Sequence, residues 1–299
     1  MDRYLVIVSA GAGDVDRPTL DAVIGVLAAA GPTEACQPGD AAGLEAALKG
    51  LDGRVPVVAG GDGSLHLVVN RLRQLGLLDR VAVGLVPLGT GNDFARGAGV
   101  PLDPVAAARA LATATPHRFD LLEDDGGAVV VNAAHAGLGA EAAAAATGYK
   151  PQLGPLAYPV GALIAGVSER GWELQVSVDG TLVASDARLL MVGVANGPTI
   201  GGGTPLAPEA RPDDGRLDVV VVAALGPAAR VAFATALRAG THVDRDDVHY
   251  LRGTSVRISG EPVRHNTDGE LGDALTAHGY QLLPTAWSLL VPQSAGAPR

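Results

Sequence analysis

The chain has 299 residues, of which 47% are hydrophobic and only 3% aromatic, and its formal net charge is −10 at pH 7. This length leaves room for about two domains, each large enough to bury its own core. The acidic charge and the scarcity of aromatic rings exclude a nucleic-acid partner, and they predict at most transient contact with a membrane.

The single cysteine, Cys36, excludes an internal disulfide and is typical of proteins in a reducing compartment. The N-terminus lacks the charged and apolar regions of a secretory signal. The longest apolar stretch, residues 156–167, is too short to span a bilayer. These features predict a soluble, cytoplasmic protein, and a homodimer is compatible with them.

Strands and helices alternate over the first 119 residues. This alternation predicts an open, mostly parallel sheet covered by helices. Asp103 and Pro104 predict a helix start, with Asp103 as the N-cap. The expected strands are residues 5–8, 55–59 and 81–85, and the expected helices are residues 20–30, 65–72 and 105–112.

From residue 120 onward, short apolar runs are separated by Gly, Pro and Asp turns. The runs are residues 128–131, 173–178, 188–195, 217–222 and 255–258. They predict an antiparallel β domain. Two apolar helical stretches, 140–146 and 156–167, either cover an apolar substrate channel or simply pack on the sheet.

A glycine-rich loop, residues 60–64 (Gly-Gly-Asp-Gly-Ser), follows an expected strand and opens an expected helix. Such a loop directs backbone N–H groups and the positive end of the helix dipole at one point, which favours phosphate. Taken alone, the loop is better explained as a turn that reverses the chain, because most glycine-rich turns do only that. A second loop of the same design, residues 87–93, follows the strand at 81–85, and an Asp-Gly-Glu turn lies at 268–270.

Together the three motifs resemble the diacylglycerol kinase catalytic family, which includes sphingosine, ceramide and bacterial lipid kinases and is related to the NAD kinases. Residues 195–197, 201–203 and 213–218 also fit its pattern. The resemblance implies an α/β nucleotide-binding domain of residues 1–119 and about 285–299. It also implies a β-sandwich substrate domain of residues 120–284, with a last strand near 287–291 that returns to the first domain.

The implied activity is transfer of a phosphoryl group from ATP to a hydroxyl of a lipid or lipid-like acceptor, with Mg²⁺ present. The chain has neither a Gly-x4-Gly-Lys-Ser/Thr loop nor a His-Arg-Asp catalytic loop, and its only lysines are Lys49 and Lys150. The phosphates are therefore expected on backbone N–H groups and hydroxyls. The expected nucleotide-binding residues are Ser9, Gly11, Gly60, Gly61, Asp62, Gly63, Ser64, Gly89, Thr90, Gly91 and Asn92.

Carboxylates are the natural partners of Mg²⁺. By resemblance, Asp62, Asp93 and Glu270 hold the catalytic ion through water, although Asp62 and Asp93 also suit helix caps. The segment 211–216 resembles a structural magnesium loop in which the backbone carbonyls of Arg211, Asp214 and Arg216 bind the ion. A simple β-turn explains this segment equally well.

By resemblance, Asp268 is the general base that accepts the hydroxyl proton. The resemblance also makes Glu270, Asp62 and Asp93 catalytic residues. From the residues alone, Asp268 is a surface turn residue, because Asp-Gly is a common turn dipeptide. An exposed turn carboxylate of that kind would contribute less than about 0.5 kcal/mol to stability.

The chain departs from the family pattern at three places: Ser9 replaces an asparagine, His66-Leu67 stands where a glutamate is usual, and Cys36-Gln37 lacks a threonine. His66 is either a nucleotide contact or a surface histidine, and the role of His135 stays open. The departures leave two alternatives to a lipid kinase. One is an NAD kinase-like enzyme, and the other is a catalytically impaired nucleotide-binding sensor or accessory protein.

Overall fold

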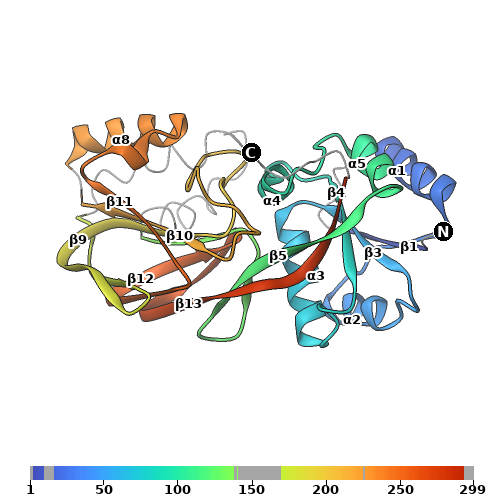
Figure 1. Cartoon of the computed structure of the whole chain (residues 1–299), viewed down its shortest axis with the longest axis horizontal. Helices are drawn as coiled ribbons and strands as arrows, with labels where there is room; N and C mark the ends of the chain where they lie inside the picture. Colours follow the sequence, from blue (N-terminus) through green and yellow to red (C-terminus); the bar gives the residue numbers. More distant parts are fainter. Residues whose placement is uncertain (1–2, 10–16, 138–139, 141–169, 225, 293–299) are drawn as a thin grey trace. The chain divides into compact units, whose positions relative to one another are not determined.

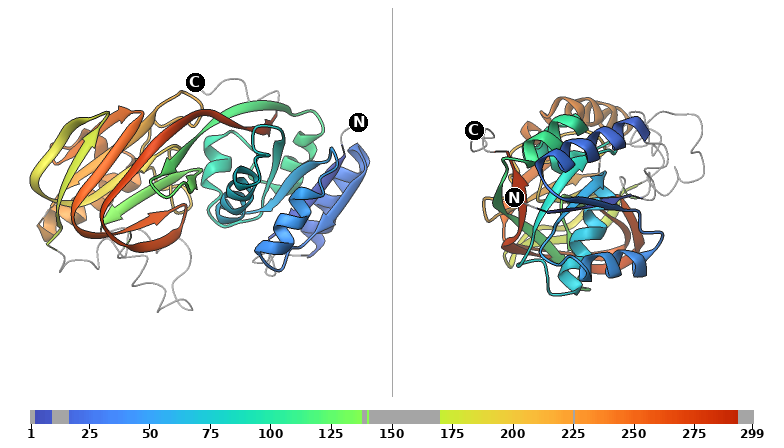
Figure 2. Two further views of the ribbon diagram at one scale, coloured as in Figure 1. Left: turned by 90° about the horizontal axis from the view of Figure 1, so that it is seen from below. Right: turned by 90° about the vertical axis from the view of Figure 1, so that its right-hand side faces the viewer.

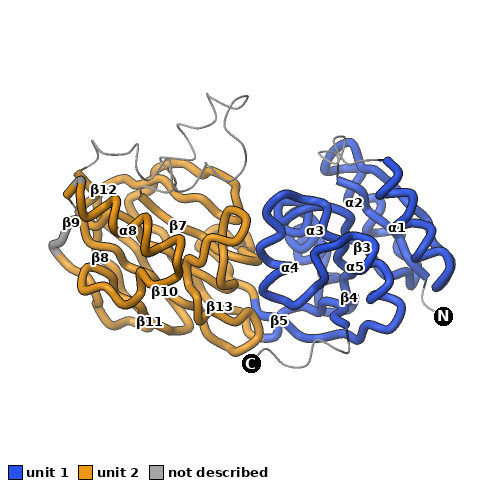
Figure 3. Tube along the Cα trace, turned by 90° about the horizontal axis from the view of Figure 1, so that it is seen from above, with its two compact units in different colours: residues 1–120, 285–299 blue, residues 121–284 orange. Residues whose placement is uncertain are grey.

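The protein is described by a computed structural model that covers residues 3–9, 17–137, 140, 170–224 and 226–292. The chain divides into two compact units (Figure 3). Unit 1 comprises residues 1–120 and 285–299, and unit 2 comprises residues 121–284. Within the described residues, no helix is long and apolar enough to cross a membrane.

The sheet of unit 1 is parallel, with strand order β2-β1-β3-β4-β13. Strand β13 enters it only through its last residues, where Ser288 pairs with Ala82 and Leu289 pairs with Val83. The long apolar runs of these strands suit a sheet buried on both faces. The strands are β1 (Tyr4–Val8), β2 (Thr33–Cys36), β3 (Val55–Gly60), β4 (Ala82–Pro87) and the end of β13 (Glu270–Val291).

Helices cover both faces of this sheet (Figures 1 and 2): α1 and α5 lie on one face, and α2 and α3 lie on the other. The carboxylate of Asp103 accepts a hydrogen bond from the backbone N–H of Ala106 at 2.7 Å, so it is the N-cap of α5. The helices are α1 (Arg17–Ala30), α2 (Ala41–Lys49), α3 (Asp62–Gln74), α4 (Asp93–Gly97) and α5 (Pro104–Leu111).

The strands of unit 2 pair antiparallel throughout the described residues. The order is β11-β10-β9-β7-β12-β13, and β8 pairs with both β9 and β12. The elements are β6 (Val129–Val130), β7 (Ala133–Gly137), β8 (Trp172–Val178), β9 (Thr181–Ala195), β10 (Leu217–Ala223), α8 (Pro227–Ala239), η3 (His242–Asp244), β11 (Val248–Gly253) and β12 (Ser255–Thr267). Strand β5 (Thr115–Asp124) runs from unit 1 into unit 2.

Two long strands fold this sheet over on itself. The first halves of β9 and β12 pair with β8, whereas their second halves pair with β7. An apolar core of valines and leucines from these strands, with Tyr280, fills the space they enclose. A second core lies on the outer face, where Phe233 and Leu237 of α8 pack on Met191, Val220 and Val222.

The observed architecture confirms the predicted fold: an α/β domain, an antiparallel β-sandwich-like domain and a last strand that returns to the first domain. The sequence patterns did not predict β2, α2 or α8. The helical stretches expected at 140–146 and 156–167 lie outside the described residues, apart from Ala140.

Candidate active site

The two glycine loops of unit 1 are in direct backbone contact. A Cβ added to Gly89 would lie 2.5 Å from the Cα of Gly61, and one added to Gly60 would lie 2.5 Å from the Oγ of Ser64. No side chain fits at these approaches, so the motif glycines are required by packing. Packing by the described residues does not require glycine at position 63, since a Cβ added to Gly63 would meet none of them within 4 Å.

Asp62 joins the two loops. It is the first residue of α3, and its two carboxylate oxygens accept hydrogen bonds from the backbone N–H groups of Asp93 and Phe94, each at 3.0 Å. The expectation that Asp62 caps its own helix is thus wrong, because the carboxylate caps α4 instead. The N–H groups of Asp93 and Phe94 at the start of α4 are thus occupied by this side chain, whereas in the first turn of α3 the N–H of Ser64 donates to the Gly61 carbonyl at 3.0 Å.

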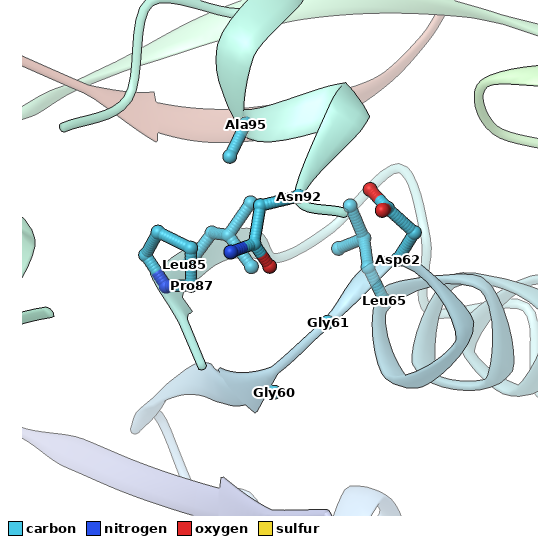
Figure 4. Close-up of a pocket in the computed structure, with 8 residues that line it drawn as sticks. All are labelled: Gly60, Gly61, Asp62, Leu65, Leu85, Pro87, Asn92 and Ala95. Atoms are coloured by element: carbon cyan, nitrogen blue, oxygen red, sulfur yellow. The ribbon is translucent and has the colours of Figure 1, made fainter. Parts of the chain in front are cut away.

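Asn92 closes the second loop. Its backbone is left-handed (φ 51°), its Oδ1 accepts from the N–H of Gly89 at 3.1 Å, and its Nδ2 donates to the Gly89 carbonyl at 2.7 Å. Figure 4 shows the pocket between the loops, with Asn92 above Gly60 and Gly61, Leu85 and Pro87 on one side and Leu65 and Asp62 on the other. These contacts fix the loops without any ligand.

The other predicted nucleotide-binding residues fall into three groups. Ser9 lies beside Gly60, since a Cβ on Gly60 would be 3.2 Å from that of Ser9, and its N–H donates to Ala59. Thr90 is exposed and Gly91 half-buried in the second loop. Gly11 lies outside the described residues.

In unit 2, Asp268 and Gly269 form the two-residue turn of the β12–β13 hairpin. Both have positive φ, 49° and 93°, as a type I′ turn requires. The Asp268 carboxylate accepts three backbone hydrogen bonds, from Val131 at 2.7 Å, Asn132 at 2.9 Å and Ala133 at 3.0 Å. The view of Asp268 as an exposed turn residue of little structural importance is therefore wrong, since it ties the hairpin to the start of β7.

Glu270 begins β13 opposite Thr267 and is exposed, and its side chain makes no hydrogen bond or ion pair with the residues that the structure describes. Asp93 is 3% exposed at the start of α4. Among the described residues, no three His, Cys, Asp or Glu side chains gather as a metal-binding group. That Asp62, Asp93 and Glu270 hold the ion through water stays a prediction.

The segment proposed for a structural ion contains a turn at Gly215 (φ 73°). The carboxylate of Asp214 is engaged by the N–H of Arg216 at 3.0 Å and by the Arg252 guanidinium. The neighbouring Asp218, which sequence reasoning passed over, is fully buried. Tyr250 donates to its Oδ1 at 2.6 Å, while its Oδ2 is buried with no donor among the described residues.

Burial raises the pKa of Asp218, and its hydrogen bond to Tyr250 and the charge of Arg252 oppose that effect. A buried carboxylate oxygen without a donor is a good partner for a cation. The donor set of the segment therefore fits a cation better through Asp218 than through the Asp214 carboxylate. The predicted use of the backbone carbonyls of Arg211, Asp214 and Arg216 stays untested.

Several histidines of unit 2 are buried or partly buried. Burial lowers the pKa of His135 to about 4, and burial together with the charges of His278 and His135 lowers that of His265 to about 4. The rings of His265 and His278 are 4.4 Å apart, and the Tyr280 hydroxyl lies 3.4 Å from His265 Nδ1. In unit 1, His66 is half-buried, with Asn70 Nδ2 3.1 Å from its Nε2.

Comparison with known proteins identifies two family matches. Residues 3–123 match the diacylglycerol kinase catalytic domain, and residues 129–291 match the YegS C-terminal NAD kinase beta sandwich-like domain. A "Probable lipid kinase YegS-like" of Stenotrophomonas maltophilia is 34% identical over 76% of this chain and 74% of the relative. A "Diacylglycerol kinase" of Bacillus subtilis is 31% identical over 79% of this chain and 78% of the relative.

The fold also matches solved structures. The crystal structure of a diacylglycerol kinase from Bacillus anthracis str. Sterne superposes with a TM-score of 0.74 and 20% sequence identity, over 99% of this chain and 98% of that chain. At this identity the likeness establishes the fold alone.

Proposed function

The chain belongs to the diacylglycerol kinase catalytic family, and on that premise we propose that it transfers the γ-phosphoryl group of ATP to a hydroxyl of a diacylglycerol-like lipid. Its relatives are lipid kinases by name, which supports a phosphotransferase activity. The nucleotide, the metal ion and the acceptor are parts of the proposal.

The observation that carries the proposal is the joined pair of glycine loops in unit 1. Asp62 holds the backbone of the second loop against the first through its hydrogen bonds to the N–H groups of Asp93 and Phe94. Preorganised N–H donors stabilise the phosphates without reorganisation during the reaction. Carboxylates with retained water suit Mg²⁺, and when bound this ion would offset the negative charge of the phosphates.

For the acceptor we propose that Asp268 takes the hydroxyl proton. Its carboxylate accepts three backbone hydrogen bonds, from Val131, Asn132 and Ala133. The same three bonds hold the carboxylate in one orientation. That orientation is what a general base needs.

The test is ADP formation with the purified chain, Mg-ATP and a panel of diacylglycerols, sphingoid bases and isoprenoid alcohols in detergent micelles. We expect ADP to form only when both an acceptor and Mg²⁺ are present. No ADP above the acceptor-free control across the panel would contradict the lipid-kinase proposal. In the same assays, NADP formed from NAD would favour the NAD kinase-like alternative, and tight nucleotide binding without turnover would favour a sensor.

A further inference from the structure

A row of directly paired residues crosses the outer face of the unit 2 sheet. His135 in β7 pairs with Gly193 of β9 on one side and with Asn266 of β12 on the other, and Asn266 pairs in turn with Leu271 of β13. Directly opposed residues of antiparallel strands project to the same face. His135, Asn266 and Leu271 therefore share one surface.

The two ends of this row differ. At one end, Val220 pairs with Gly193 and is buried in the core beneath Phe233 of α8. At the other end, Leu271 is 37% exposed. Between the covered core and the exposed Leu271, the row contains the imidazole of His135 and the side-chain amide of Asn266.

His135 is chemically unsatisfied in this row. The residue is half-buried, and its Nδ1 is buried with no hydrogen-bond partner within the described part of the chain. Because burial lowers its pKa to about 4, the ring is neutral near pH 7. A neutral imidazole has one donor and one acceptor nitrogen, so it can bond a hydroxyl or an ester carbonyl. A buried polar atom without a partner is costly, and a ligand atom would relieve that cost.

The row is also tied to the Asp268 turn. The Asp268 carboxylate binds the N–H groups of residues 131–133, which lie two to four positions before His135 in the chain. Asn266 Oδ1 accepts from the N–H of Gly269 at 3.0 Å. His265, by contrast, pairs with Ala136 and therefore lies on the opposite face, with the enclosed core.

We propose that His135, with Asn266 beside it, hydrogen-bonds the polar head group of the lipid acceptor, while the apolar part of the lipid lies toward Leu271. This rests on the proposed function, since it assigns the acceptor of that reaction. The head group is a neutral one, with hydroxyl and ester oxygens, as in a diacylglycerol. His135 is an acceptor-binding residue and takes no proton from the reacting hydroxyl.

The first test compares steady-state kinetics of His135→Ala and His135→Gln with 1,2-dioctanoylglycerol in detergent micelles. We expect His135→Ala to raise the KM for the lipid about tenfold, which matches one lost hydrogen bond, and to leave the KM for Mg-ATP within about twofold. His135→Gln should recover part of the loss, because the amide can still donate and accept. The matched control, His249→Ala, removes an exposed histidine of the same unit and should change nothing. A lipid KM within twofold of wild type in His135→Ala would overturn the inference.

The second test needs no turnover and so separates this inference from the proposed function. Imidazole NMR signals of the ¹⁵N-histidine-labelled chain are followed as dioctanoylglycerol micelles are added without nucleotide, and His135 is assigned from His135→Gln. A shift of the His135 signals with lipid, but not with detergent alone, supports the inference even if no ADP forms with any acceptor. Unmoved His135 signals in a chain that does phosphorylate the lipid overturn the inference and leave the proposed function standing.

Discussion

Two aspartates, Asp62 in unit 1 and Asp268 in unit 2, accept hydrogen bonds from backbone N–H groups of other segments. The two differ in how far along the chain those segments lie. Asp62 binds the start of a helix that follows the next strand along the chain. Asp268 binds residues about 135 positions earlier, across the sheet. A carboxylate that belongs to a recognisable motif can thus have a structural task that the motif itself does not reveal.

The largest expected effect comes from Asp268→Asn. Turnover should fall ~10²–10⁴-fold, as for loss of a general base. The free energy of unfolding should also fall by about 1–3 kcal/mol, because the amide nitrogen faces a backbone donor. Kinetics with a competent acceptor and urea denaturation measure the two effects. Wild-type kcat in this variant would show that Asp268 only holds the turn.

Acid should destabilise unit 2 at a higher pH than unit 1. All of the described histidines whose pKa burial lowers belong to unit 2, namely His135, His242, His265 and His278. Since the folded pKa lies below the unfolded value of 6.5, the unfolded state binds more protons, and stability is lost as the pH falls from 6.5 toward 4. For His135 and His265 the loss is roughly 3 kcal/mol each.

The two tryptophans report on this acid transition separately, since Trp172 belongs to unit 2 and Trp287 to unit 1. Fluorescence of the Trp287→Phe and Trp172→Phe variants should show the Trp172 signal changing at the higher pH. Coincident transitions of the two reporters would mean that the units unfold together.

Asp62→Asn should act on unit 1 alone. An amide offers one acceptor oxygen, so one of the two N–H groups of α4 loses its partner and the second loop shifts. Loss of one hydrogen bond to a charged group corresponds to about 1.5–3 kcal/mol, so we expect a KM for Mg-ATP raised about tenfold or more. The KM for the lipid should stay within twofold. An equal rise in both would indicate damage beyond the glycine loops.

The smallest expected effect is a difference in stability between alanine substitutions at two glycines, Gly63 of the first loop and Gly89 of the second. In Gly89→Ala the added Cβ would lie 2.5 Å from the Gly61 Cα and 2.9 Å from Asn92 Oδ1, so the loops must separate, at about 1–3 kcal/mol. Gly63→Ala has open space and should raise the stability of α3 by up to about 1 kcal/mol. Urea denaturation measures the free energy of unfolding of both variants. Equal values for Gly89→Ala and Gly63→Ala would contradict the backbone contact between Gly89 and Gly61.

Local sequence patterns predicted most of the strands and helices of unit 1. The apolar runs, the glycine loops and the Asp103 cap each depend on neighbours within a few residues, and the structure confirms those strands and helices. Helix α8 carried similar signals, Pro227 at its first turn and Gly240 at its C-cap with φ 73°, but it interrupts a segment dominated by strand patterns.

The tertiary contacts of unit 2 could not be predicted in this way. The partners of Asp268, the buried Asp218 and the unsatisfied ring of His135 all depend on which strands pair and in which register. Register between distant strands is set by the packing of whole faces, which no short motif encodes.

The packing of Trp287 bears on the order in which the protein folds during synthesis. Trp287 is fully buried in unit 1, with ring centroids 5.4 Å from Phe94 and 6.0 Å from Phe119, and its strand completes the sheet beside β4. Unit 2 is continuous in sequence and precedes these residues. The whole of the β domain is therefore synthesised before unit 1 can close its core. Phe94 follows directly on Asp93, so the glycine loops gain their final support only from residues that come after the β domain in sequence.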